Sequence, residues 1–292
     1  MDVKGIIVAM VTPFDENQKI DFQATKQLVN KLIADGVYGI FILGTNGEFH
    51  LLNNQEKVEF AKCVIDETHK RVPVYVGTGG NSTAEVIELS KQMEALGADA
   101  LSVITPYFLA PSQEELICHY KAVAAAVNVP IVLYNIPKNT GINIAIETVA
   151  ELAKVKNIIG IKDSSGNIDN IEGYINVSKD QEFAVLSGSD SLILKALKVG
   201  AKGAIAATAN LLTKNDVAIY ENFINDKMEE AEAAQQKIEM LRSVLKLATV
   251  PSVLKKSLVL SNMPVGPCRL PVIGPKAEAI PKIKEMLEYY GL

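Results

Sequence analysis

Lys162 follows the apolar run Ile158–Ile161, so a charged amine stands where a buried strand would end. Burial disfavours the charged ammonium, and a neutral amine can attack a ketone to form an imine. An imine is an electron sink for making or breaking the neighbouring carbon–carbon bond. A lone lysine at a strand end more often reaches back to solvent or pairs with a carboxylate, so Lys162 alone does not establish this chemistry.

Tyr134 gives the amine a chemical partner. It is the fifth residue of the apolar run that begins at Pro130, and Lys162 is the fifth of the run that begins at Ile158. Neighbouring strands lie about 4.8 Å apart, so the two side chains could share one pocket. A phenol beside the amine could move protons while the imine forms. A buried tyrosine with a satisfied hydroxyl is the alternative.

The segment Gly44–Glu48 is a glycine-flanked loop after another apolar run. Its backbone N–H groups could form a nest for a carboxylate, and Thr45 adds a hydroxyl for a proton relay. A simple turn from strand to helix is the alternative.

Other chemistries find little support in the sequence. Nucleotide-binding glycine motifs and the zinc motif HExxH are missing, so we expect no cofactor and no metal. The three histidines are scattered, and His69 and His119 fall in helical patterns, which predicts surface positions for both.

Short β-branched apolar runs alternate with longer amphipathic stretches along most of the chain. Continuous apolar runs of this length are typical of parallel strands buried on both faces. The runs are Gly5–Val11, Gly39–Gly44, Pro73–Gly79, Ala100–Pro106, Pro130–Asn135, Ile158–Ser164, Phe183–Ser189 and Gly203–Ala209. Helical patterns between them include Asp21–Asp35, Asn54–Lys70 and Ser82–Leu96, with Asn53, Ser82 and Ser112 as N-caps.

Eight strands with helices between them predict an α/β fold, a (β/α)8 TIM barrel. A doubly wound sheet is the alternative, but it would show a glycine-rich turn after the first strand, where this chain has Thr12–Phe14. We expect the barrel to span residues 1–225 and a C-terminal helical extension to span 226–292. The predicted helices there are Lys214–Ile224, Met228–Ala248, Ser252–Ser261 and Pro275–Tyr290. In this fold the active site lies at the carboxyl ends of the strands.

The bulk composition is that of a folded globular protein. Of 292 residues 48% are hydrophobic, and the net charge of −5 with no basic stripe argues against a nucleic-acid partner. No apolar run reaches the roughly 18 residues of a membrane span. Three widely spaced cysteines favour a cytoplasmic protein.

Together these motifs resemble the family of dihydrodipicolinate synthase and N-acetylneuraminate lyase. The resemblance runs from Thr12–Phe14 to Gly266–Arg269 and covers nearly the whole chain. Gly44–Glu48 is similar to the family's pyruvate-carboxylate loop, Tyr134–Pro137 to its tyrosine segment and Gly160–Asp163 to its Schiff-base strand. The order and spacing of these motifs are specific. The resemblance implies a class I lyase or aldolase that acts on pyruvate and forms a homotetramer, often a dimer of dimers.

The resemblance also implies residue roles. Lys162 would form the imine, and Tyr134 would relay protons and contact the bound carboxylate. Thr45 and Asn46 would bind that carboxylate and extend the relay. Gly188 and Ile205 would line the pocket through their backbones.

A first departure from the family pattern is Phe108. It stands where the family usually has a relay tyrosine that is donated across a subunit interface, and a phenylalanine cannot carry a proton. Tyr107, one place earlier, or a water would then take over, or the relay would be shorter.

A second departure is Asn139, which stands where the synthase normally has an arginine for the carboxylate of aspartate semialdehyde. An amide loses a charge-assisted bond worth roughly 1.5–3 kcal/mol. The strings Gly-x-Asn-Gly-Glu-Phe, Lys-Asp-Ser and Gly-Pro-Cys-Arg resemble instead the 4-hydroxy-2-oxoglutarate aldolase branch, with the 2-keto-3-deoxy-sugar-acid aldolases close behind. There Ser164 would contact the distal part of the substrate.

Three hypotheses follow. The leading one is a class I aldolase that releases pyruvate or glyoxylate-type products from a hydroxylated 2-oxo acid. The second is dihydrodipicolinate synthase, which condenses pyruvate with aspartate semialdehyde. The third, motivated by Phe108, is a non-catalytic protein that binds a 2-oxo acid.

Overall fold

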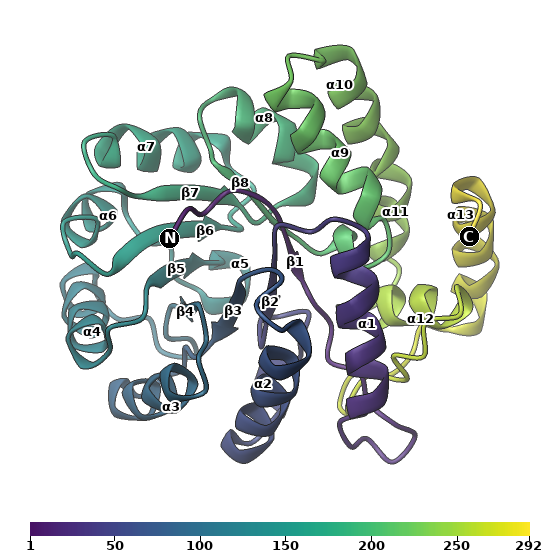
Figure 1. Cartoon of the computed structure of the whole chain (residues 1–292), viewed down its shortest axis with the longest axis horizontal. Coiled ribbons are helices and arrows are strands. Elements are labelled where there is room, and N and C mark those ends of the chain that lie inside the picture. The colour runs from purple at the N-terminus through teal and green to yellow at the C-terminus, as the bar shows by residue number, and fades with distance from the viewer.

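Eight parallel strands close into one barrel in the order β1 to β8 (Figure 1), as the sequence predicts. The computed structural model describes residues 1–292. Almost every strand residue is buried, because the barrel fills one face and helices cover the other, which explains the continuous apolar runs. The strands are β1 (Gly5–Ala9), β2 (Gly39–Ile42), β3 (Val74–Gly77), β4 (Ala100–Ile104), β5 (Ile131–Asn135), β6 (Ile158–Asp163), β7 (Ala184–Ser187) and β8 (Gly203–Ala206).

Helices fill the crossovers and surround the strands (Figure 1). Asn53, Ser82 and Ser112 cap α2, α3 and α4, as expected, and two of these caps are complete capping boxes. The barrel helices are α1 (Phe22–Ala34), α2 (Asn54–Thr68), α3 (Thr83–Ala95), α4 (Gln113–Ala126), α5 (Pro137–Thr140), α6 (Ile146–Leu152), α7 (Ile168–Ser178), α8 (Ile193–Lys198) and α9 (Thr213–Ile224). Short 3-10 turns span Phe49–Leu51, Asp190–Leu192, Thr208–Asn210 and Ala277–Ala279.

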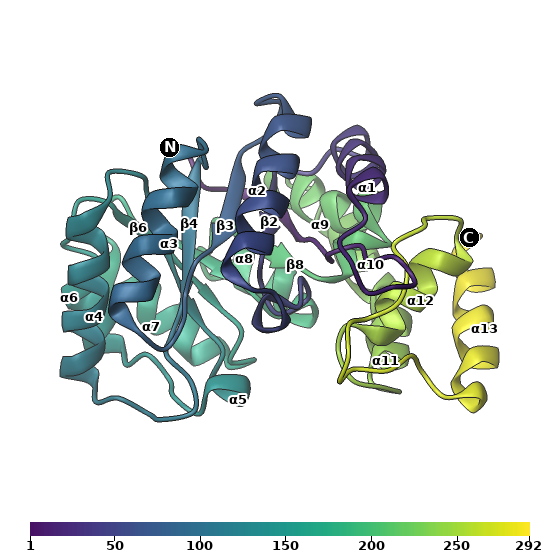
Figure 2. The same cartoon turned by 90° about the horizontal axis from the view of Figure 1, so that it is seen from below.

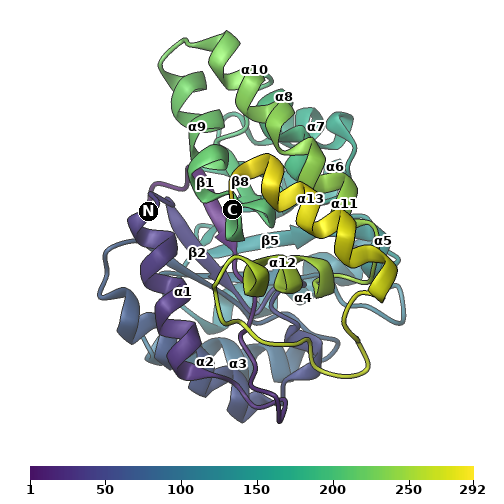
Figure 3. The ribbon, with the colours of Figure 1, turned by 90° about the vertical axis from the view of Figure 1, so that its right-hand side faces the viewer.

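Four helices follow the barrel: α10 (Met228–Lys237), α11 (Glu239–Leu245), α12 (Ser252–Leu260) and α13 (Ile280–Tyr290). The single helix expected over Met228–Ala248 is therefore divided at Ile238. Helix α10 packs on α9 and α8, whereas α13 packs on α11 and α12. Figures 2 and 3 show α11, α12 and α13 together at one side of the molecule. None of the helices combines the length and apolarity needed to cross a membrane.

His119 corrects one expectation. Although it lies in a helix, its side chain is buried, and Nδ1 pairs with the Thr83 hydroxyl at 2.9 Å. Burial lowers the pKa of His119, because it penalises the charged ring. The amphipathic pattern predicted the helix but misplaced this position on it.

Candidate active site

A cavity of about 710 Å³ opens at the carboxyl ends of the strands, where a barrel enzyme is expected to work. Its walls come partly from the strand ends and partly from α11 (Glu239–Leu245), α12 (Ser252–Leu260) and the segment between them. The predicted site residues that line it are Thr45, Asn46, Tyr134, Asn139, Lys162, Ser164, Gly188 and Ile205.

Lys162 lies in this cavity with only 3% of its surface exposed. Tyr134 is its direct register partner on β5. The Lys162 Nζ atom lies 4.2 Å from the centre of the Tyr134 ring and 4.9 Å from that of Phe41. No carboxylate pairs with Lys162, which removes the structural explanation for a buried lysine. Two aromatic rings lie beside the Nζ atom instead, and neither a hydrogen bond nor an ion pair occupies this nitrogen.

Asp163 faces the opposite side of β6, as strand alternation requires. Its carboxylate accepts hydrogen bonds from Asn135 at 2.7 Å and from Ser165 at 2.6 Å. Burial raises the pKa of Asp163, and those hydrogen bonds oppose the effect. Asp163 therefore ties β6 to β5 and does not neutralise the lysine.

Thr45 and Tyr134 form a hydroxyl pair beside the lysine. Their oxygens lie 3.2 Å apart, and either can be the donor. Such a pair can pass a proton in either direction, which a buried tyrosine bonded to a carbonyl could not do. The pair joins the loop after β2 to the strand that carries Tyr134.

Gly188 makes room for the lysine. A Cβ atom at this position would lie 2.1 Å from the Ser164 hydroxyl and 2.9 Å from Lys162 Cε. The Ser164 hydroxyl donates to the Gly188 carbonyl at 3.2 Å, and the Gly188 N–H donates to the Asp163 carbonyl at 2.7 Å. Only glycine allows the end of β7 to approach β6 this closely.

Contacts with distant segments of the chain fix the Gly44–Glu48 loop in place. The Thr12 hydroxyl donates to the Gly47 carbonyl at 2.7 Å, and Glu48 adopts a left-handed backbone conformation with φ of 54°. The Glu48 side chain is fully buried and accepts from Lys255 Nζ at 3.1 Å. Burial lowers the pKa of Lys255, and the Glu48 carboxylate opposes that effect.

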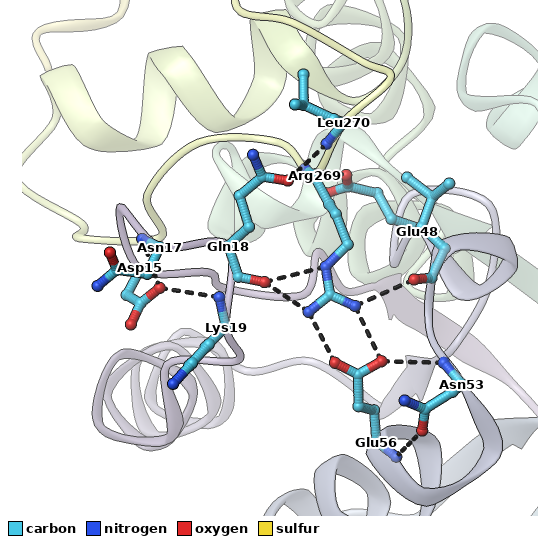
Figure 4. A network of polar contacts seen from close by, with 10 residues as sticks. Asp15, Asn17, Gln18, Lys19, Glu48, Asn53, Glu56, Arg269 and Leu270 are labelled. Atoms are coloured by element: carbon cyan, nitrogen blue, oxygen red, sulfur yellow. Dashed lines mark hydrogen bonds and ion pairs between the residues drawn. The ribbon is translucent and has the colours of Figure 1, made fainter.

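Arg269 extends this support across the chain (Figure 4). Its backbone N–H donates to the second Glu48 oxygen at 2.9 Å. Its guanidinium binds the Glu56 carboxylate through two nitrogens, at 3.0 and 2.9 Å, and donates to the Gln18 carbonyl. The Gly-Pro-Cys-Arg motif thus clamps the loop that is expected to bind a carboxylate.

Sequence reasoning missed several cavity residues. Asp190, after β7, accepts from the N–H groups of Ala207 and Thr208 at 3.1 Å and so fixes the end of β8. The rule that strand ends carry function could have found it. Arg242 and Lys246 also line the cavity, but they come from α11 and its end, and no pattern in the sequence pointed to them.

Tyr107 and Phe108 do not line the cavity. The Tyr107 ring packs against Phe49, with the centroids 6.1 Å apart. The Phe108 side chain is 92% exposed on a backbone with φ of 79°. Within one chain, neither residue supplies the relay group that the family usually places here.

Known proteins with similar sequences show which family the chain belongs to. Residues 2–289 match the dihydrodipicolinate synthetase family. The chain belongs to this family. It is 40% identical to 4-hydroxy-tetrahydrodipicolinate synthase 1 of Halalkalibacterium halodurans over 278 residues, 95% of this chain and 94% of the relative. It is also 40% identical to the synthase of Syntrophus aciditrophicus, over 289 residues and 99% of both chains.

Solved structures agree with this assignment. A dihydrodipicolinate synthase of Bacillus anthracis superposes with a TM-score of 0.95 at 35% identity, covering 99% of this chain and 98% of that one. A chloride-inhibited synthase of Acinetobacter baumannii, complexed with pyruvate, gives 0.95 at 34% identity and 99% of both chains. The protein is thus a class I pyruvate-dependent lyase of this family. The relatives' names favour the synthase, ranked second from sequence, over the aldolase branch that was ranked first.

Proposed function

We propose that the protein joins pyruvate to an aldehyde through an imine on Lys162, with aspartate semialdehyde as the first candidate for the aldehyde. The observation that carries the proposal is the unpaired Lys162 amine, 4.2 Å from the centre of the Tyr134 ring, with the Tyr134 hydroxyl 3.2 Å from Thr45. The names of its relatives, at up to 40% identity, support the synthase reaction.

The reaction balances with pyruvate, an aldehyde and water. The Lys162 amine attacks the pyruvate ketone, and loss of water gives the iminium. A proton then leaves the methyl carbon, and the enamine forms a carbon–carbon bond to the aldehyde, whose oxygen takes up a proton. Water then adds to the product iminium and breaks its carbon–nitrogen bond, which releases the product as a ketone and restores the Lys162 amine. The Tyr134–Thr45 pair would carry these protons.

The other predicted site residues receive roles on the same basis. Thr45 and Asn46 would bind the pyruvate carboxylate, and Gly188 and Ile205 would present their backbones to the bound substrate. Ser164 would contact the part of the substrate beyond the imine.

Borohydride trapping tests the imine directly. We expect the full chain, incubated with pyruvate and then reduced, to gain one covalent adduct on Lys162, located by peptide mass spectrometry. Lys162→Met should gain none, and Lys284→Gln, an exposed lysine outside the cavity, should label like the unmodified protein. Absence of an adduct on Lys162 would overturn the proposal.

A second candidate is cleavage of 4-hydroxy-2-oxoglutarate or a 2-keto-3-deoxy sugar acid. Asn139 favours it, because this neutral amide lines the cavity where the synthase normally has an arginine. Turnover of pyruvate with aspartate semialdehyde, measured beside release of pyruvate from 4-hydroxy-2-oxoglutarate, separates the two. A kcat/KM at least about tenfold higher for one reaction decides between them.

The assembly is proposed to be a homotetramer in the cytoplasm. Phe108 and Leu109, 92% and 75% exposed at the tip of the loop after β4, support burial against another copy. Light scattering at several concentrations tests the assembly, and a purely monomeric protein would contradict it.

A further inference from the structure

The charges of the cavity differ in sign from those of the whole protein. The chain carries a net charge of −5, yet the cavity is lined by four cationic side chains and by one acidic side chain, Asp190. The cations are Lys138, Lys162, Arg242 and Lys246. Lys162 is committed to the imine, and the loop at Thr45–Asn46 already serves the pyruvate carboxylate. Three further cations therefore remain for an anion beyond pyruvate.

Arg242 is the one among these three whose side chain is held in place. It is only 29% exposed, and its Nε donates to the Ser191 hydroxyl at 3.2 Å. One terminal nitrogen forms an ion pair with the Asp190 carboxylate at 3.7 Å, a separation beyond hydrogen-bond distance. That carboxylate already accepts from the N–H groups of Ala207 and Thr208. The terminal nitrogens of Arg242 donate no hydrogen bond within the chain, so their N–H groups are available to a ligand, while Asp190 offsets part of the guanidinium charge.

We propose that Arg242 determines specificity for the second substrate by binding a carboxylate on the aldehyde. This inference rests on the proposed function, and it narrows the aldehyde to one that carries an acid group. A guanidinium can bind a carboxylate through two parallel N–H donors, which neither Asn139 nor a lysine can match. Lys246, exposed one turn further along at the end of α11, adds charge to the same wall. The C-terminal extension thus supplies the cation that the β5 segment lacks at Asn139.

Steady-state rates with three aldehydes test the assignment. The purified full chain receives saturating pyruvate and either aspartate semialdehyde, glyoxylate or glyceraldehyde, and product is measured by mass spectrometry. The first two carry a carboxylate and the third is neutral. The variants are Arg242→Gln, Arg242→Lys and, as a matched charge control in the same extension, Lys284→Gln.

We expect the unmodified protein to prefer a carboxylate-bearing aldehyde over glyceraldehyde by at least about tenfold in kcat/KM. Arg242→Gln should lower that kcat/KM by roughly 10- to 100-fold, mainly through KM, because it removes a charge-assisted bond. Arg242→Lys should recover part of the loss, and the rate with glyceraldehyde should change by less than about twofold. Lys284→Gln should match the unmodified protein.

Two results would overturn the inference: equal losses with all three aldehydes, which would indicate a structural role, or a preference for glyceraldehyde in the unmodified protein. Borohydride trapping with pyruvate alone separates failure of this inference from failure of the proposed function. If Lys162 is labelled in both the unmodified protein and Arg242→Gln, imine formation is intact, and the rates with the three aldehydes test only the role of Arg242. If Lys162 is labelled in neither, the proposed function and this inference fall together.

Discussion

Replacing Lys255 with methionine should destabilise the fold by about 3–5 kcal/mol, because it leaves the buried Glu48 carboxylate without a counter-charge. The Lys255 and Glu48 side chains are 1% and 0% exposed, and their charged atoms lie 3.1 Å apart. After the change, the Glu48 carboxylate keeps the N–H of Arg269 but loses its only counter-charge within 4 Å. Lys255 also donates to the Thr12 carbonyl at 2.8 Å, so that acceptor loses its partner as well.

The same change should weaken pyruvate binding. Glu48 closes the Gly44–Glu48 loop, and this loop is expected to hold the pyruvate carboxylate. Urea unfolding would give the change in free energy, and the pyruvate dependence of borohydride trapping would report on the loop. The double variant Glu48→Gln with Lys255→Met buries no charge, so its loss should fall short of the sum of the single losses by at least about 1 kcal/mol.

An exposed ion pair provides the control for this experiment. The Lys62 and Asp66 side chains are each 61% exposed, so Lys62→Met should cost less than about 1 kcal/mol. If Lys255→Met costs no more than Lys62→Met, or if the double variant shows no coupling, the buried pair does not support the loop.

Three further changes probe the site and the core. Gly188→Ala should cut labelling of Lys162 by at least about tenfold, since the added Cβ would lie 2.9 Å from Lys162 Cε, while Gly274→Ala, where a Cβ meets open space, should have no effect. Tyr134→Phe keeps the ring but removes the hydroxyl proposed for the proton relay, so kcat should fall by roughly 10²- to 10⁴-fold while labelling by pyruvate, followed over hours, still occurs. Burial raises the pKa of Asp216 well above 3.8, so the folded state retains a proton that the unfolded state releases above about pH 4. The unmodified protein should therefore lose stability relative to Asp216→Asn as the pH rises from about 4.5 to 7.5, and thermal unfolding that shows the opposite slope would contradict this assignment.

The barrel was predictable because its physical cause is local in the sequence. A parallel strand buried on both faces must be apolar along its whole length, and each of the eight runs contains one observed strand. The pairing of Lys162 with Tyr134 was predictable for a related reason. Both stand at the same place in equivalent runs, and the register aligns them directly.

The remaining parts of the site depend on contacts between distant segments. Lys255 and Glu48 are separated by 207 positions, and Arg269 and Glu56 by 213. Each of these residues, read alone, resembles an ordinary charge on a helix or a loop. Periodicity reports which face of an element is buried, but not which other element covers that face. Arg242 was missed for the same reason, because only the packing of α11 on the barrel brings it into the cavity.

The groups proposed for imine chemistry and much of the remaining cavity wall come from different elements of the fold. The groups proposed for imine chemistry, Lys162, Tyr134 and Thr45, come from the barrel strands and the loop after β2. A large part of the remaining wall comes from residues 242–254, in α11, in α12 and in the segment between them. Because the two walls belong to different elements, substitutions in residues 242–254 can change the second substrate while the imine site stays intact. Imine formation should therefore respond to changes at the ends of β2, β5, β6 and β7, and aldehyde preference should respond to changes at Arg242 and its neighbours.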